Sequence, residues 1–110
     1  MDKSFVEYLE EQCEPKMNNK EFYKKVLDTY GKQQVIVAIE ELSELQKELC
    51  KALRHKVNFD NIVEEIADVE IMIEQMKIYF NILNKDLERM KEHKIERTKE
   101  RLGLWQVKNV

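Results

Sequence analysis

Hydrophobic residues recur at every third or fourth position along most of this sequence, a spacing that gathers them on one face of an α-helix. The pattern predicts four main helices, over about residues 19–30, 33–54, 61–80 and 85–102. A shorter run before Pro15 predicts an accessory N-terminal helix. The expected fold is therefore all-α and resembles a four-helix bundle.

The residues that interrupt this pattern mark the ends of the expected helices. The chain of 110 residues has only two Gly and one Pro, too few for the tight turns of an all-β fold. Asp60 or Asn61 is expected to cap the helix over 61–80, because such side chains accept hydrogen bonds from a first helical turn. The expected organisation is an accessory segment over 1–18, one helical domain over 19–103 and a tail over 104–110.

Composition narrows the choice of environment and partners. The longest apolar run, 35–39, has five residues, whereas a membrane span needs about 20. No apolar signal segment is evident after Met1, so we expect a cytoplasmic protein without a membrane partner. The net charge of −3 argues against binding to a nucleic acid polymer. Cys13 and Cys50 are expected to be reduced and without a chemical role.

Two acidic groups are not explained by a need for surface charge. In the helix over 33–54, Glu41, Glu44 and Glu48 fall on one stripe, where like charges repel. In the next helix, Glu65 projects into the apolar arc and Asp68 lies at the edge of that arc. A carboxylate that faces a core is costly unless it is paired, hydrogen-bonded or bound to a metal.

A short connector between these two helices would place Glu41 and Glu44 beside Glu65 and Asp68. Four carboxylates around one space suit a hard cation, Mg²⁺ or Mn²⁺. The alternatives are chance spacing in a Glu-rich helix and neutralisation of Glu65 by Lys or Arg from another helix. These residues alone leave the choice open.

The motif Glu40-Glu41-x-x-Glu44, followed after 20 residues by Glu65-x-x-Asp68, resembles the EExxE…ExxD signature of MazG-like nucleoside triphosphate pyrophosphohydrolases. These enzymes belong to an all-α superfamily that also includes dimeric dUTPases. The resemblance covers about residues 19–102. It implies Mg²⁺-dependent hydrolysis, with Mn²⁺ as a possible substitute, of a nucleoside triphosphate between its α and β phosphates.

The resemblance also implies roles for individual residues. Glu41, Glu44, Glu65 and Asp68 would be the metal ligands. The expected catalytic residues are Glu40 and Glu41, with Glu40 the candidate for orienting or deprotonating the attacking water. A bound cation would neutralise the triphosphate and lower the pKa of a bound water.

Substrate contacts are expected from residues outside the acidic motif. Lys94, Arg97 and Arg101 share one stripe of the last helix and are candidates for holding the β and γ phosphates. The alternative is a solvated face on which they pair with neighbouring Glu residues. Gln34 is a weaker candidate for a base or sugar contact, as is Tyr30. Trp105 could stack on a base or pack against protein.

The family usually oligomerises, and this chain has independent support for that. The helix over 61–80 carries Ile71, Ile73 and Ile78 beyond its main apolar stripe, so one helix partner would leave some of them in water. We expect a homodimer or homotetramer. The expected role is nucleotide-pool house-cleaning, with a non-catalytic interaction or regulatory module as the alternative. Specificity for dUTP or phosphoribosyl-ATP stays open.

Overall fold

The computed structural model describes residues 4–12 and 17–104, and all of its regular elements are helices. They are α1 (Phe5–Gln12), α2 (Asn19–Tyr30), α3 (Gln33–Leu53), α4 (Phe59–Tyr79) and α5 (Asn84–Arg101). The all-α class expected from the sequence is confirmed. Trp105 and Cys13 lie outside the described residues, and Cys50 is an exposed free thiol. None of the described helices is both long and apolar enough to cross a membrane.

Caps and turns explain where the helices begin and end. The Asn18 side chain accepts a hydrogen bond from the Glu21 N–H at 2.8 Å, and Gly31, with φ +55°, ends α2. Asn58 caps α4 by accepting from the Asn61 N–H at 3.1 Å. The sequence-based assignment of this cap to Asp60 or Asn61 is therefore wrong, and α4 begins two residues earlier than expected.

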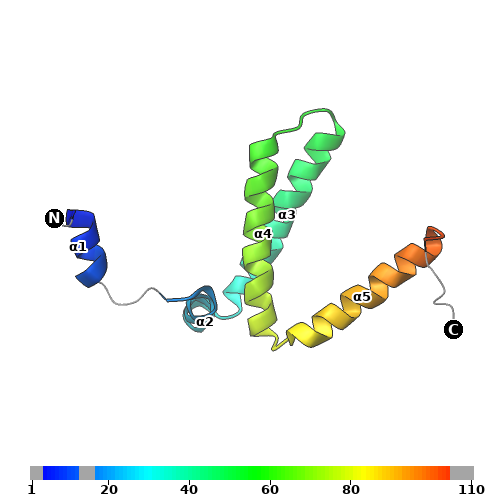
Figure 1. The fold of residues 1–110 in the computed structure, drawn as a ribbon. Helices are drawn as coiled ribbons and strands as arrows, with labels where there is room; N and C mark the ends of the chain where they lie inside the picture. Colours follow the sequence, from blue (N-terminus) through cyan, green and yellow to red (C-terminus); the bar gives the residue numbers. More distant parts are fainter. Residues whose placement is uncertain (1–3, 13–16, 105–110) are drawn as a thin grey trace.

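Helices α3 and α4 form the centre of the fold, as an antiparallel pair joined by a short connector (Figure 1). Helix α2 packs across the other end of this pair, mainly against α4. The buried apolar side chains are Ala38 on α3 and Val69 and Met72 on α4. Next to them, the buried Gln34 amide donates a hydrogen bond to Gln75 Oε1 at 2.8 Å, which ties α3 to α4.

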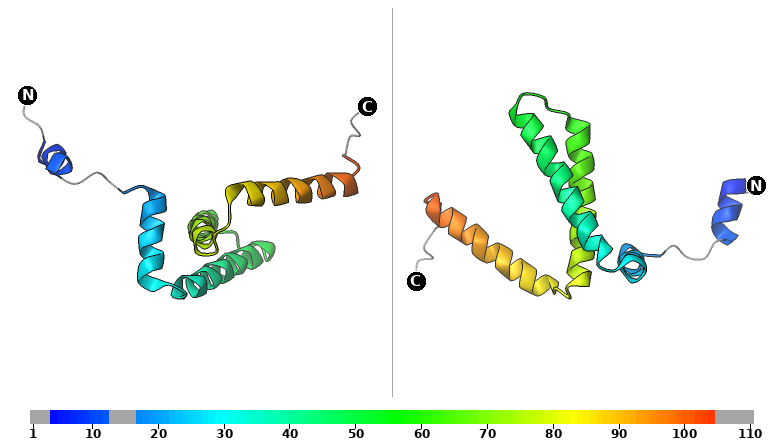
Figure 2. Two further views of the ribbon diagram at one scale, coloured as in Figure 1. Left: turned by 90° about the horizontal axis from the view of Figure 1, so that it is seen from below. Right: turned by 180° about the vertical axis from the view of Figure 1, so that it is seen from behind.

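Helix α5 leaves this group of helices. It follows a turn in which Asn81 has φ +54°, and it projects away from the α3–α4 pair in each view (Figure 2). Among the described residues, α5 contacts no other helix. The fold is compatible with a bundle, but within residues 4–12 and 17–104 only α2, α3 and α4 pack together.

Candidate metal centre

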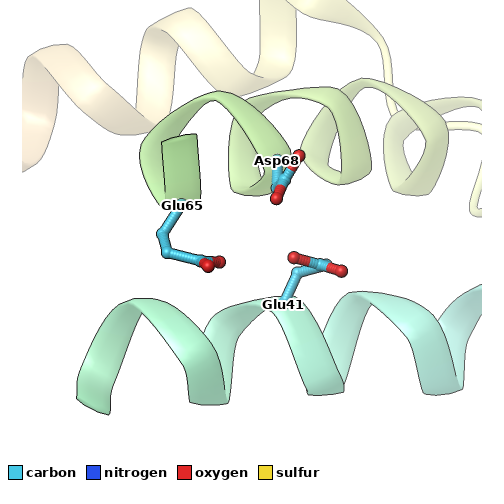
Figure 3. Close-up of side chains that lie close together, drawn as sticks. All are labelled: Glu41, Glu65 and Asp68. Atoms are coloured by element: carbon cyan, nitrogen blue, oxygen red, sulfur yellow. The ribbon is translucent and has the colours of Figure 1, made fainter. Parts of the chain in front are cut away.

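Three carboxylates meet between α3 and α4. Glu41 reaches across from α3, and Glu65 and Asp68 project from successive turns of α4 (Figure 3). One carboxylate oxygen from each residue lies within 4.8 Å of those of the other two. All three residues are half-buried, so the cluster belongs to the helix interface and not to the freely solvated surface.

The local sequence explains why these side chains converge. The short connector makes α3 and α4 antiparallel, and the Asn58 cap sets the start of α4. Ala38 lies one turn before Glu41 and Val69 directly follows Asp68, and both are buried. The small side chain of Ala38 is thus part of the buried core beside the cluster. The spacing Glu65-x-x-Asp68 then places two carboxylates on adjacent turns of the same face.

The electrostatics of the cluster disfavour three free negative charges. Burial raises the pKa of Glu41 above its ordinary value of 4.5, and the charges of Asp68 and Glu65 raise it further. The pKa of Glu65 is raised first by burial and then by the charges of Asp68 and Glu44. A cation held between the carboxylates would remove this repulsion.

The donor set fits a hard divalent cation. Glu65 Oε2 is buried and has no hydrogen-bond partner among the described residues, so it is an acceptor without a donor. Oxygens on opposite sides of Mg²⁺ are about 4.2 Å apart, and around a larger cation such as Ca²⁺ they reach about 5 Å. Adjacent oxygens around Mg²⁺ are about 3.0 Å apart, so the oxygens of Glu41, Glu65 and Asp68, which lie within 4.8 Å of one another, would have to move closer together to share one Mg²⁺. His and Cys are absent from this cluster, which argues against zinc.

The other expected ligand and the expected water-orienting residue lie beside the cluster. Glu44 is exposed and its oxygens are not among the three that meet, although its charge helps to raise the pKa of both Glu41 and Glu65. Glu40 is exposed on α3, next to Glu41. The assignment of Glu44 as a ligand and of Glu40 as a catalytic residue stays a prediction.

The expected substrate-binding residues are not gathered at the carboxylates. Lys94, Arg97 and Arg101 are exposed on α5, which contacts neither α3 nor α4 within the described chain. Gln34 is buried, and its amide is used in the hydrogen bond to Gln75. Tyr30 is 60% exposed at the end of α2. Any contact of α5 with the cluster therefore requires a second chain or a different position of α5.

Two buried polar residues were not assigned a role from the sequence. Glu48 is buried on α3. The sequence pattern placed it on the stripe of Glu41 and Glu44, but it did not show that this residue would be buried. Gln75 is buried on α4, seven positions after Asp68 and thus on nearly the same face as that residue. Their helical spacing was the available signal, but spacing alone does not show which edge of a stripe another helix will cover.

Comparison with known proteins adds no assignment. No protein-family model matches this chain, and neither the curated proteins nor the solved structures contain a significant match. The interpretation of the site therefore depends on its own geometry and on the spacing of the carboxylate motif.

Proposed function

We propose that this protein is a Mg²⁺-dependent, MazG-like nucleoside triphosphate pyrophosphohydrolase that acts in cytoplasmic nucleotide-pool house-cleaning. The observation that carries the proposal is the convergence of Glu41, Glu65 and Asp68, whose oxygens lie within 4.8 Å of one another. A second feature supports it, because Glu65 Oε2 is buried without a hydrogen-bond donor.

The residues would divide the work of an in-line hydrolysis. Glu41, Glu65 and Asp68 hold Mg²⁺ or Mn²⁺, and Glu44 completes the set from the next turn of α3. When bound, the cation supplies neutralisation of the triphosphate and a lower pKa for a bound water. Glu40 orients the attacking water and accepts its proton. The water oxygen bonds to the α-phosphorus as the bond to the β-phosphate oxygen breaks, which yields a nucleoside monophosphate and pyrophosphate.

We further propose that the working form is a homodimer or homotetramer. The support is the small apolar core of one chain, in which Ala38, Val69 and Met72 are the buried hydrophobic residues described. Large apolar side chains remain exposed on both central helices, among them Ile39 at 59% and Val63 at 51%. A second copy that covers them would stabilise the fold and could bring another α5 to the carboxylates. Light scattering coupled to gel filtration measures the mass directly, and a monomer at micromolar concentration would contradict this part.

Product analysis tests the proposed reaction. Purified protein is incubated with Mg²⁺ and a panel of ordinary, deoxy and damaged nucleoside triphosphates, and pyrophosphate and orthophosphate are measured separately. We expect pyrophosphate and the monophosphate from at least one nucleotide, and no turnover in EDTA. Release of orthophosphate alone would show a different bond cleavage. Absence of turnover on the whole panel would favour a non-catalytic module.

A matched pair of variants links the reaction to the cluster. Glu65→Gln removes one ligand charge at nearly constant volume, and Glu70→Gln makes the same change at an exposed position of the same helix. We expect Glu65→Gln to lower kcat/KM by more than about 100-fold, since loss of even an indirect metal contact costs about 10- to 100-fold. Glu70→Gln should retain full activity. Equal activity of both variants would remove the cluster from the mechanism.

A further inference from the structure

A cavity of about 610 Å³ lies between α2, the last turns of α4 and the turn that follows them. Helix α2 lies beside the end of α4 from which the chain turns into α5 (Figure 1). Small-molecule sites in proteins usually measure about 300–1,000 Å³, so this space is large enough for a metabolite. The first residue of α4 in its lining, Glu74, follows Asp68 by six positions, or about 9 Å along the helix. Because Glu41, Glu65 and Asp68 are not part of the lining, the cavity is a second candidate site outside the carboxylate cluster.

Lysines give this cavity a positive lining. Lys20 and Lys24 lie one turn apart on α2, and Lys77 lies on α4. The acidic residue among the described lining residues is Glu74, which forms an ion pair with Lys77 at 3.0 Å. Three positive charges and one negative charge leave a net charge of +2 in a chain whose net charge is −3. The lining is thus opposite in sign to the carboxylate cluster and favours an anion.

Contacts within the chain do not use up these positive charges. In the part of the chain that the structure describes, neither Lys20 nor Lys24 forms an ion pair. The Lys77 ammonium donates to the two Glu74 oxygens at 3.0 and 3.2 Å, and its third N–H is left for a ligand. Because the Lys77 side chain is only 18% exposed, water screens its charge poorly. A bound anion would remove the repulsion among the three ammonium groups.

The rest of the lining suits an organic group beside the anion. Tyr23 and Ile78 line the cavity and are both half-buried, so they offer apolar surface that is already held in place. Ile82 and Leu83 add apolar surface from the turn after α4, where they are 44% and 54% exposed. A ring that packs against Tyr23 would gain both apolar contact and aromatic stacking.

We propose that this cavity binds a small phosphomonoester whose organic group is aromatic or otherwise apolar. A phosphomonoester carries about −1.5 to −2 charges at neutral pH, which matches the net charge of the lining, whereas a single carboxylate would leave one positive charge unbalanced. The phosphate oxygens accept hydrogen bonds from Lys20, Lys24 and Lys77, and lysine is a common phosphate ligand in proteins. The organic group packs against Tyr23. This binding needs no metal, and the inference does not rest on the proposed reaction.

Amide NMR spectra of the full chain, recorded in EDTA during titration with phenyl phosphate, test the site. Without metal the carboxylate cluster stays anionic and repels phosphate, so binding there does not contribute. We expect saturable shifts at Tyr23, Lys24, Lys77 and Asn81, beyond those that sodium chloride produces at the same ionic strength. Inorganic phosphate should shift the same amides with lower affinity, because it lacks the organic group. Absence of saturable shifts at these residues, or shifts confined to the basic stripe of α5, would overturn the inference.

A matched pair of variants on α2 links binding to the cavity. Lys24→Gln removes one lining charge, and Lys25→Gln makes the same change at the next residue, which is exposed and does not line the cavity. We expect Lys24→Gln to weaken phenyl phosphate binding by about tenfold, since it loses a charge-assisted hydrogen bond. Lys25→Gln should bind as the unmodified protein does. Both lysines are exposed, so neither change should prevent folding. Equal affinity of the two variants would show that the cavity is not the site.

Tyr23→Leu tests where the organic group lies. This variant keeps apolar volume and removes the ring, so we expect weaker binding of phenyl phosphate and unchanged binding of inorganic phosphate. Equal weakening of both probes, or of neither, would contradict the placement of the organic group against Tyr23.

These measurements use no metal and no triphosphate, and so they are independent of the proposed reaction. If phenyl phosphate binds in the cavity and no nucleotide yields pyrophosphate, the reaction is wrong and the phosphomonoester site stands. If pyrophosphate is released and phenyl phosphate does not bind in the cavity, the reaction stands and the inference is wrong.

Discussion

The α3–α4 pair and α5 differ in both charge density and surroundings, since 13 of the 42 residues in the pair are charged but 12 of the 18 residues of α5 are. Between α3 and α4, carboxylates are pressed into a helix interface, and burial raises the pKa of Glu41 and Glu65. On α5, all but one of the residues are exposed, and the ion pairs Lys91–Glu88 and Lys99–Glu96 are ordinary surface contacts at 3.2 Å. Acidic side chains are therefore half-buried with raised pKa values between α3 and α4, whereas on α5 they remain solvated.

This difference teaches that the helix partner, and not the local charge pattern, decides what a charged stripe does. The acidic stripe of α3 faces α4 and becomes a candidate site. The basic stripe of α5 has no partner within the described chain. The proposed oligomer would supply that partner, and the predictions below test how far the contrast between the two regions holds.

The largest expected effect is complementation between subunits. Glu65→Gln and a variant with Lys94, Arg97 and Arg101 all changed to Gln should each be nearly inactive if α5 holds phosphates. If α5 serves the carboxylates of its partner, mixing and reassociating equal amounts should restore about a quarter of full activity, because half of the dimers then carry one intact site. Pyrophosphate release measures this directly.

The outcome separates three arrangements of α5. No recovery from two inactive variants would place α5 at the carboxylates of its own chain. Full activity of the α5 variant before mixing would show that its basic stripe is a solvated face. A mixture of Glu70→Gln with the α5 variant should keep about half of full activity in every arrangement, and so controls for activity lost during the mixing procedure.

The next largest effect is expected in the pH dependence of the free energy of unfolding, which Mg²⁺ should change. Because the pKa values of Glu41 and Glu65 are raised in the fold, the metal-free folded state binds more protons than the unfolded state. The free energy of unfolding should therefore fall as pH rises above 4.5, the ordinary value, through the raised pKa values. Mg²⁺ should oppose this loss, because it binds the ionised form of the carboxylates.

Urea unfolding in EDTA and in Mg²⁺, at several pH values, checks this prediction. Glu65→Gln should be more stable than the unmodified protein near neutral pH in EDTA, and less responsive to Mg²⁺. Glu70→Gln should follow the unmodified protein. A metal-free protein that becomes more stable over the same rise in pH would contradict the account of the cluster.

The sequence alone predicted most of the carboxylate cluster between α3 and α4. The helical period and the short connector placed Glu41, Glu65 and Asp68 on facing turns, and the structure brings these three together. An acidic residue within an apolar stripe was the decisive signal at Glu65. Burial of Glu48 could not be predicted in the same way, since it depends on how far α4 covers the edge of the α3 stripe.

The position of α5 relative to the other helices could not be predicted from the sequence. The period of α5 indicates that a helix forms, and its bounds were expected within one residue at each end. Its direction is set by the turn at Asn81, where a positive φ breaks the path of α4. A polar helix has little apolar surface with which to select a docking position, so its sequence does not specify a neighbour. Gln34 shows a further limit, because its hydrogen bond to Gln75 across the helix interface could not be predicted from the sequence, and its expected contact with a substrate stays a prediction.

A smaller effect is expected from this buried amide pair. Gln75→Ala should lower the free energy of unfolding by about 1–3 kcal/mol, because it leaves the Gln34 amide buried without its acceptor. Replacing both residues by Leu should cost less than the sum of the single changes. A double-mutant cycle in urea measures the coupling. Independent, additive effects would show that the hydrogen bond does not hold α3 to α4.

The smallest effect is expected on α5, and its size is informative. Glu96→Gln removes the partner of Lys99 from a contact in which both side chains are about half exposed. In an isolated, solvated helix this change should alter the free energy of unfolding by less than about 0.5 kcal/mol, and added salt should abolish even that. A loss above about 1 kcal/mol in urea unfolding would mean that the pair is desolvated, and hence that another chain covers α5. The contrast between the two regions would then belong to the single chain and not to the assembled protein.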